Sequence, residues 1–178
     1  LPDRIHDGYG LNESLIASAL QAGTDTILTC DNGIAAAAEI GFAKKNGMTV
    51  VVTDHHEVPF DTDGEGNRNE ILPPADAIVD PKRAEEKYPF TEICGAVVAY
   101  KLIQVLLEQG TETLSYKEDE KVKLLNELLE FAALATVCDV MELKDENRII
   151  VKEGMKQMQK SGNIGLKALI HVNGLDEK

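Results

Sequence analysis

The triplet Asp54-His55-His56 is the part of this 178-residue chain with the clearest chemical potential. A carboxylate and two imidazoles in succession can bind a divalent metal ion, because Asp oxygens and His ring nitrogens are common metal ligands. Another acidic residue, Asp31, stands in a similar context at Asp31-Asn32-Gly33. If the two segments converge, they form a candidate metal site.

The elements around these segments predict that they do converge. Residues 26–30 and 49–53 are runs rich in β-branched side chains, which are typical of buried parallel strands, and each ends directly before one acidic segment. Between them an Ala-rich helix is predicted from Ile34 to about Asn46, with Gly47 as its C-cap. Strand, helix and strand form a βαβ unit, whose parallel strands end at the same sheet edge.

The whole chain is expected to have an α/β fold, with a parallel sheet flanked by helices and a mainly helical second half. The α/β part covers about residues 1–93 and the helical part about 94–178. A first helix is predicted over about residues 12–22, with Asn12 as its N-cap, and a third strand over 75–79. Residues 57–74 are polar and are interpreted as a mobile surface loop. Further helices are predicted over residues 94–109, 119–137, 148–159 and 165–172.

The composition limits the classes of function. A formal charge of −13 argues against a free-standing nucleic-acid binder, because phosphate contacts need clustered Lys and Arg. A nucleic-acid substrate would therefore need a metal at the site and other domains for most of its binding. No apolar run is long enough to cross a membrane, and no secretory signal opens the chain. Cys30, Cys94 and Cys138 are interpreted as reduced core thiols, so we expect a cytoplasmic protein.

An ordered set of motifs then carries a family resemblance. The segments 29–33 and 52–56 resemble motifs II and III of the DHH phosphoesterase superfamily, and within it they are most similar to the RecJ group of single-strand-specific exonucleases. The resemblance continues along the chain in five further segments: 2–11, 72–81, 95–102, 135–140 (motif IV) and 146–148. Such a set is far more specific than a lone triplet.

The resemblance implies metal-dependent phosphodiester hydrolysis, as a 5′-to-3′ exonuclease on single-stranded DNA in repair and recombination. Two Mn²⁺ or Mg²⁺ ions would activate water and neutralise the phosphate. The implied metal ligands are Asp31, His55 and Asp139, and the implied catalytic residues are Asp54, His55 and His56. Within that triplet, we expect Asp54 to orient its neighbours and His56 to donate to a phosphate oxygen or to support the ligands.

Two arginines are candidates for binding the substrate. Arg4 and Arg148 stand in segments that resemble the family, and either side chain can hold a phosphate through a bidentate contact. Each is as readily explained by a surface ion pair. The expected partners of the full-length protein are single-stranded DNA and a single-strand-binding protein or helicase.

Two other interpretations stay open. One is a different DHH phosphoesterase that cleaves short oligonucleotides, cyclic dinucleotides or pyrophosphate. The other is a non-catalytic relative that binds nucleic acid or a replication partner. Intact Asp31, His55 and Asp139 argue against the non-catalytic interpretation.

The 178-residue chain should be inactive by itself. The family's first motif, an Asp-x-Asp pair, and its DHH-associated domain are absent from the chain, which we expect to be the central part of a larger enzyme. The remaining ligands are too few for a two-metal clamp. The chain should therefore not hydrolyse 5′-phosphorylated single-stranded DNA in millimolar Mn²⁺. Turnover near that of the full-length enzyme, abolished by a chelator, would contradict this expectation.

Overall fold

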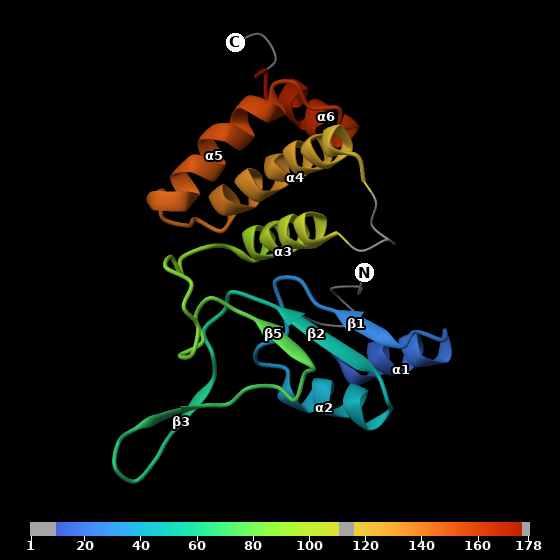
Figure 1. The fold of residues 1–178 in the computed structure, drawn as a ribbon, viewed down its shortest axis with the longest axis vertical. Helices are drawn as coiled ribbons and strands as arrows, with labels where there is room; N and C mark the ends of the chain where they lie inside the picture. The colour runs from blue at the N-terminus through green and yellow to red at the C-terminus, as the bar shows by residue number, and fades with distance from the viewer. Residues whose placement is uncertain (1–9, 111–115, 176–178) are drawn as a thin grey trace. The chain divides into compact units, whose positions relative to one another are not determined.

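The computed structural model describes residues 10–110 and 116–175 of the chain (Figure 1). It divides into two compact units, Leu1–Val98 and Ala99–Lys178, each of which is considered by itself. The first unit contains the sheet and the candidate metal site. Helix α3 (Gly95–Gln109) begins in the first unit and continues in the second.

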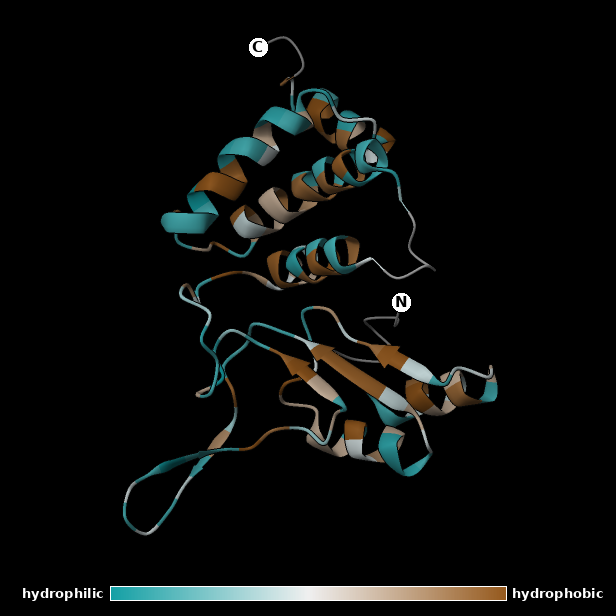
Figure 2. Ribbon diagram, in the orientation of Figure 1, coloured by the Kyte–Doolittle hydropathy of each residue, from teal (hydrophilic) through white to brown (hydrophobic). Residues whose placement is uncertain are grey.

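The first unit is built on a three-stranded parallel sheet. Its strands are β1 (Thr26–Leu28), β2 (Thr49–Thr53) and β5 (Ala77–Val79), in the order β1-β2-β5. The central strand β2 is the most buried, and Val50 and Val52 are fully shielded from solvent. Figure 2 shows hydrophobic residues along all three strands. The prediction of neighbouring parallel strands ending near residues 30, 53 and 79 is therefore confirmed.

Two helices complete the core of this unit. Helices α1 (Glu13–Gln21) and α2 (Ala37–Lys45) contribute Ile16 and Ile40 to a cluster with the side chains of β2. The Asn12 side chain caps α1 as predicted, because Leu15 N donates to Asn12 Oδ1 at 2.8 Å. Gly47 follows the end of α2 with a φ of 80°, which a glycine adopts without strain.

Helix α2 begins three residues later than predicted. The chain first makes a turn in which Ala36 N donates to Gly33 O at 3.0 Å. In that turn Ile34 N points to the Asp54 carboxylate, at 2.9 Å from Oδ2, instead of joining a helix. Helix α2 therefore starts only after a segment whose backbone donates to the Asp54 carboxylate.

Residues 57–74, interpreted as a mobile surface loop, contain a β-hairpin that the sequence did not predict. Its strands β3 (Phe60–Thr62) and β4 (Arg68–Glu70) pair antiparallel. At the turn, Glu65 N and Asn67 N both donate to Asp63 Oδ1 at 2.9 Å. The strands are short and mostly exposed on both faces, so they lack the alternation of apolar and polar residues that identifies a strand in a sequence.

The second unit is helical, as predicted for the second half of the chain. Helices α4 (Glu118–Cys138) and α5 (Asp145–Met158) pack against each other, and α6 (Ile164–Val172) follows them. Gly154 makes the close packing possible, because a Cβ there would lie only 2.3 Å from Ala133 Cβ. Of the helices in the described part of the chain, none is long and apolar enough to cross a membrane.

The prediction that the cysteines are core thiols holds for one of the three. Cys94 is buried, but Cys30 and Cys138 are exposed. Cys30 lies just beyond the end of β1 and Cys138 is the last residue of α4. The apolar neighbours of Cys30 and Cys138 in the sequence therefore did not indicate that these two side chains belong to the core.

Candidate metal centre

The candidate site lies where β1 and β2 end side by side. Thr53 ties the two strands together beyond their last paired residues, since its Oγ1 donates to Thr29 O at 2.6 Å and its N donates to Thr29 Oγ1 at 3.2 Å. One step further, Asp31 N donates to Thr53 O at 3.0 Å. These bonds hold Asp31 beside the triplet that follows β2.

Asp31 occupies a tight and unusual position. Its φ of 60° lies in the left-handed region, which Asp tolerates better than most residues because its short side chain bonds locally. The start of helix α3 presses against it, and a Cβ on Gly95 would lie 2.5 Å from both Asp31 Cβ and Asp31 Oδ1. Only glycine fits at position 95 without moving Asp31.

The Asp54 carboxylate organises the triplet. It is 1% exposed and accepts hydrogen bonds from backbone and side-chain donors. Ile34 N donates to Oδ2 at 2.9 Å, and His55 N donates to Oδ1 at 2.8 Å. The His56 ring nitrogen Nδ1 lies 2.6 Å from Oδ1. Asp54 thus holds the His55 backbone and the His56 ring in place, and its role in catalysis stays a prediction.

Three side chains present their ligand atoms to one point. Asp31, His55 and His56 each offer one ligand atom, and these atoms all lie within 4.8 Å of one another. His55 Nε2 is 2.9 Å from Asp31 Oδ1. No other group of three His, Cys, Asp or Glu side chains converges in this way among the residues that the structure describes. A carboxylate with an imidazole suits a divalent ion such as Mn²⁺, and Asp31 and His55 fit that group.

The hydrogen bond between Asp54 and His56 shifts the pKa values of both. Burial alone would raise the pKa of Asp54, but the hydrogen bonds from Ile34 N, the His56 ring and His55 N outweigh it and lower the pKa. The hydrogen bond to Asp54 raises the pKa of His56, and burial opposes it. His56 is therefore biased towards its charged form.

The other predicted site residues belong to the second unit or fall outside the described residues. Asp139 is the C-cap of α4 in the second unit, where its N donates to Ala135 O at 2.8 Å. Arg148 lies exposed on α5 in the same unit. Arg4 falls outside the described residues. The roles of all three stay predictions.

Sequence reasoning assigned no role to two residues near the site, Gly95 and Asp80. Asp80 directly follows β5 and is fully buried. Burial raises its pKa, as does the charge of Asp54, while the hydrogen bond from Lys82 N lowers it. The signal for Asp80 was its place after a third strand at the same sheet edge. Both residues stand in segments that resemble the family, 72–81 and 95–102, but the contact of Gly95 with Asp31 could not be found from the sequence because the two residues are distant in the chain.

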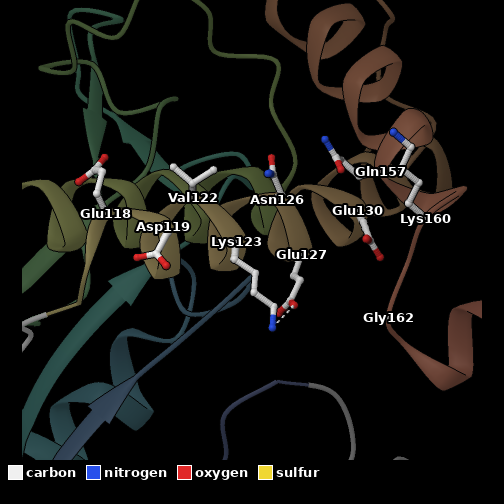
Figure 3. Close-up of a pocket in the computed structure, with 10 residues that line it drawn as sticks. All are labelled: Glu118, Asp119, Val122, Lys123, Asn126, Glu127, Glu130, Gln157, Lys160 and Gly162. Atoms are coloured by element: carbon white, nitrogen blue, oxygen red, sulfur yellow. Dashed lines mark ion pairs between the residues drawn. The ribbon is translucent and has the colours of Figure 1, made fainter.

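A pocket in the second unit is a different kind of feature (Figure 3). It is lined by Glu118, Asp119, Val122, Lys123, Asn126, Glu127, Glu130, Gln157, Lys160 and Gly162. Lys123 and Glu127 form an ion pair of 3.9 Å along α4. The most buried acid of the pocket, Glu130, accepts a hydrogen bond from Ser161 Oγ at 2.5 Å. The mixed charges of the pocket and the bonds among its residues are typical of a solvated helix surface.

A comparison with family models shows to which protein family the chain belongs. The model described as "DHH family, N-terminal domain" matches residues 1–136. The chain belongs to the DHH family. This match includes Asp31 and the Asp54-His55-His56 triplet.

Curated relatives from the DHH family are similar over almost the whole chain. The single-stranded-DNA-specific exonuclease RecJ of Bacillus subtilis (strain 168) is 38% identical over 176 residues, which are 99% of this chain and 19% of that protein. RecJ of Escherichia coli (strain K12) is 34% identical over 180 residues, 99% of this chain and 29% of that protein. The chain thus spans less than a third of these relatives.

Solved structures agree with this relationship. An exonuclease RecJ bound to manganese matches with a TM-score of 0.75 and 31% identity, over 99% of this chain and 40% of that one. RecJ of Thermus thermophilus in complex with Mn²⁺ matches with a TM-score of 0.66 and 30% identity, over 90% of this chain and 21% of that one. The fold described above is therefore similar to that of these two RecJ structures.

A methyl group at position 95 should disturb the metal centre. Gly95→Ala forces Asp31 to move, so we expect a loss of stability of about 1–3 kcal/mol and weaker Mn²⁺ binding. Chemical denaturation and Mn²⁺ titration measure the two effects. Gly64→Ala is the matched control, because a Cβ there meets nothing within 4 Å. Equal Mn²⁺ affinity in the two variants would contradict the expected clash between a Cβ at position 95 and Asp31.

The Asp54–His56 pair should make stability depend on pH at both ends of a window. Because the pKa of Asp54 is lowered, its contribution is complete above the unfolded value of about 3.9 and is lost as the pH falls through the folded value. Because the pKa of His56 is raised, its contribution is complete below about 6.5 and is lost as the pH rises through the folded value. The ring is exposed to solvent, which limits the size of the effect.

Asp54→Asn tests this coupling directly. The pKa of His56 should fall towards its ordinary value, as followed by NMR titration of the His56 ring protons. Asp61→Asn, which removes a carboxylate from the exposed strand β3, is the control. A His56 pKa that is the same in both variants would show that another group raises it.

Proposed function

We propose that this chain is the metal-binding core of a RecJ-type exonuclease, which hydrolyses phosphodiester bonds of single-stranded DNA from the 5′ end with Mn²⁺ or Mg²⁺. The observation that carries the proposal is the convergence of the Asp31, His55 and His56 ligand atoms within 4.8 Å at the end of a parallel sheet. The names of the relatives, which are single-stranded-DNA-specific exonucleases, support the choice of substrate. The two manganese-bound RecJ structures support the choice of metal.

The residues of this chain have different roles in the proposed hydrolysis. Asp31 and His55 would hold a metal ion, which when bound would supply an activated water and neutralise the phosphate. Asp54 fixes the His55 backbone and the His56 ring. The His56 ring is 58% exposed and is biased towards its charged form, so it suits a contact with a phosphate oxygen.

The second unit would contribute the residues that remain predictions. Asp139 is the proposed third ligand, and Arg148 is a proposed phosphate contact. Arg4 is the corresponding proposal in the first unit. The charge of −13 supports a division in which other parts of the full-length protein bind most of the DNA.

The test uses the full-length protein with end-labelled single-stranded DNA. Asp31→Asn and His55→Ala should each abolish Mn²⁺-dependent hydrolysis and weaken Mn²⁺ binding. Asparagine is preferred at position 31 because it tolerates the positive φ there, whereas alanine adds backbone strain. Asp31→Asn removes a negative charge from the acidic sheet edge. The metal-free variant should therefore be as stable as the unchanged protein, or more stable.

The controls separate the competing functions. Asp61→Asn, on the exposed hairpin, should retain full activity. Full metal-dependent activity of Asp31→Asn would overturn the proposed centre. Faster cleavage of short oligonucleotides, cyclic dinucleotides or pyrophosphate than of long single strands would assign the site to another DHH phosphoesterase. Mn²⁺ binding with no hydrolysis of any of these substrates would point to a binding module.

A further inference from the structure

Lys82 places a positive charge beside the proposed metal centre. Strands β2 and β5 pair in parallel, so both end at the sheet edge where the metal centre lies. The turn after β5 is held there because Lys82 N donates to Asp80 Oδ1 at 2.9 Å. From this turn the Lys82 side chain reaches the segment after β2, where its Nζ lies 3.0 Å from Glu57 Oε1. Glu57 directly follows His56, so the ammonium group lies next to the end of the triplet.

The two partners of this ion pair differ in how firmly they are held. The Lys82 side chain is 19% exposed, so most of its aliphatic stem is packed against other residues while the charged end reaches its partner. The Glu57 side chain is 82% exposed. Ion pairs with an exposed partner contribute little to stability, because water screens the charges. Lys82 therefore has a well-placed ammonium group whose present partner is easily displaced.

Two other basic side chains of the first unit are used by the fold. The Arg83 guanidinium group turns back to the sheet, where its Nη1 donates to Ile78 O at 3.0 Å. Lys44 Nζ donates to both carboxylate oxygens of Asp76, at 2.7 and 2.6 Å. Asp76 directly precedes β5, so this pair lies at the opposite sheet edge from the metal centre. Lys82 differs from both, because its ammonium group stands at the edge of the metal centre with an exposed partner.

A nucleic-acid strand at this edge needs positive groups. Asp31, Asp54 and Asp80 follow the three strands of the sheet, and their carboxylates repel phosphates. A bound divalent ion would neutralise the phosphate that it contacts, but the next phosphates of the strand would still face these acids. A lysine ammonium group carries a full charge and three donors, which suit a phosphate oxygen.

We propose that Lys82 is a substrate-binding residue, whose ammonium group exchanges Glu57 for a phosphate of the single strand, next to the phosphate at the metal. This inference rests on the proposed function and extends the site beyond the residues that would hold the ion. Glu57 keeps the ammonium group in place while DNA is absent. Because the contact is made to a phosphate, it does not depend on the base sequence.

The first test measures binding of fluorescently labelled single-stranded DNA to the full-length, metal-free protein at several salt concentrations. Lys82→Gln should reduce the slope of log affinity against log salt by about 0.7, the value for one phosphate contact in a single strand. This slope corresponds to about fivefold weaker binding in 0.1 M salt. Lys82→Arg keeps the charge and should bind within about twofold of the unchanged protein.

Lys45→Gln is the matched control for the loss of a positive charge. Lys45 is exposed in the last turn of α2, which leads into the start of β2 and so lies away from the metal centre. Its replacement should leave the salt slope unchanged and the affinity within about twofold, because salt screens a distant charge. Equal losses in Lys82→Gln and Lys45→Gln would overturn the proposal, since only the net charge would then matter. A lower unfolding temperature of Lys82→Gln, with binding that Lys82→Arg fails to restore, would also overturn it.

The exchange of partners is tested by Glu57→Gln, alone and combined with Lys82→Gln. Removing the competing carboxylate should tighten binding of single-stranded DNA by up to about fivefold, the range that exposed ion pairs allow. Part of this gain comes from the freed ammonium group, so the gain should be larger when Lys82 is present than in the Lys82→Gln background. Equal gains in the two backgrounds would overturn the exchange, because Glu57 would then act on the DNA only by repulsion.

Hydrolysis with Mn²⁺ separates DNA binding from support of the metal centre. Lys82→Gln should lower kcat/KM by about fivefold and leave kcat unchanged, because the phosphate contact is present both before and during cleavage. A lowered kcat with unchanged affinity for single-stranded DNA would overturn the binding role.

The outcomes also separate this inference from the proposed function. If Asp31→Asn abolishes hydrolysis and Lys82→Gln binds single-stranded DNA as Lys45→Gln does, the metal centre stands and the role of Lys82 is overturned. If Asp31→Asn keeps full metal-dependent hydrolysis and Lys82→Gln still shows the reduced salt slope, the metal centre is overturned and the phosphate contact of Lys82 stands.

Discussion

The buried charge of Asp54 is the constraint on which the rest of the site depends. A carboxylate that is 1% exposed is tolerated only when hydrogen bonds replace its water. Those bonds come from the segment after β1 and from the two histidines that follow Asp54. Because Asp54 precedes the histidines, one carboxylate oxygen can accept from both. The order of the triplet thus lets one carboxylate fix the His55 backbone and the His56 ring at once.

The same requirement explains the glycine after β1. Ile34 N reaches Asp54 Oδ2 only because the chain turns sharply at Gly33, whose φ is 117°. A Cβ there would lie 3.1 Å from Thr29 Oγ1 and 3.2 Å from a methyl group of Val52. The turn therefore needs glycine for its conformation and for the close approach to the sheet. The turn at Gly33 brings Ile34 N to the Asp54 carboxylate, and Asp31 stands at the sheet edge just before this turn.

The sequence predicted those features that depend on local patterns. The β-branched runs, the Asn12 cap and the triplet at a strand end all carry their signal within a few residues, and the structure has each of them. Features that depend on spatial pairing were missed. Gly95 matters only because it abuts Asp31, and Asp80 only because β5 pairs with β2. The hairpin was missed because its strands bury no face. The roles of Asp139 and Arg148 stay predictions.

The β3–β4 hairpin has a practical consequence. Its two ends are joined where Ile71 N donates to Pro59 O at 2.7 Å, and its turn is held by Asp63 alone. A Cβ at Gly64 or Gly66 would meet nothing within 4 Å. Gly64 is the better of the two, because Gly66 has a φ of 88°. Once the exposed Cys30 and Cys138 are replaced by serine, a cysteine at position 64 would therefore give a fluorophore or a spin label an attachment point that follows the triplet closely in the chain without disturbing the bonds that hold it.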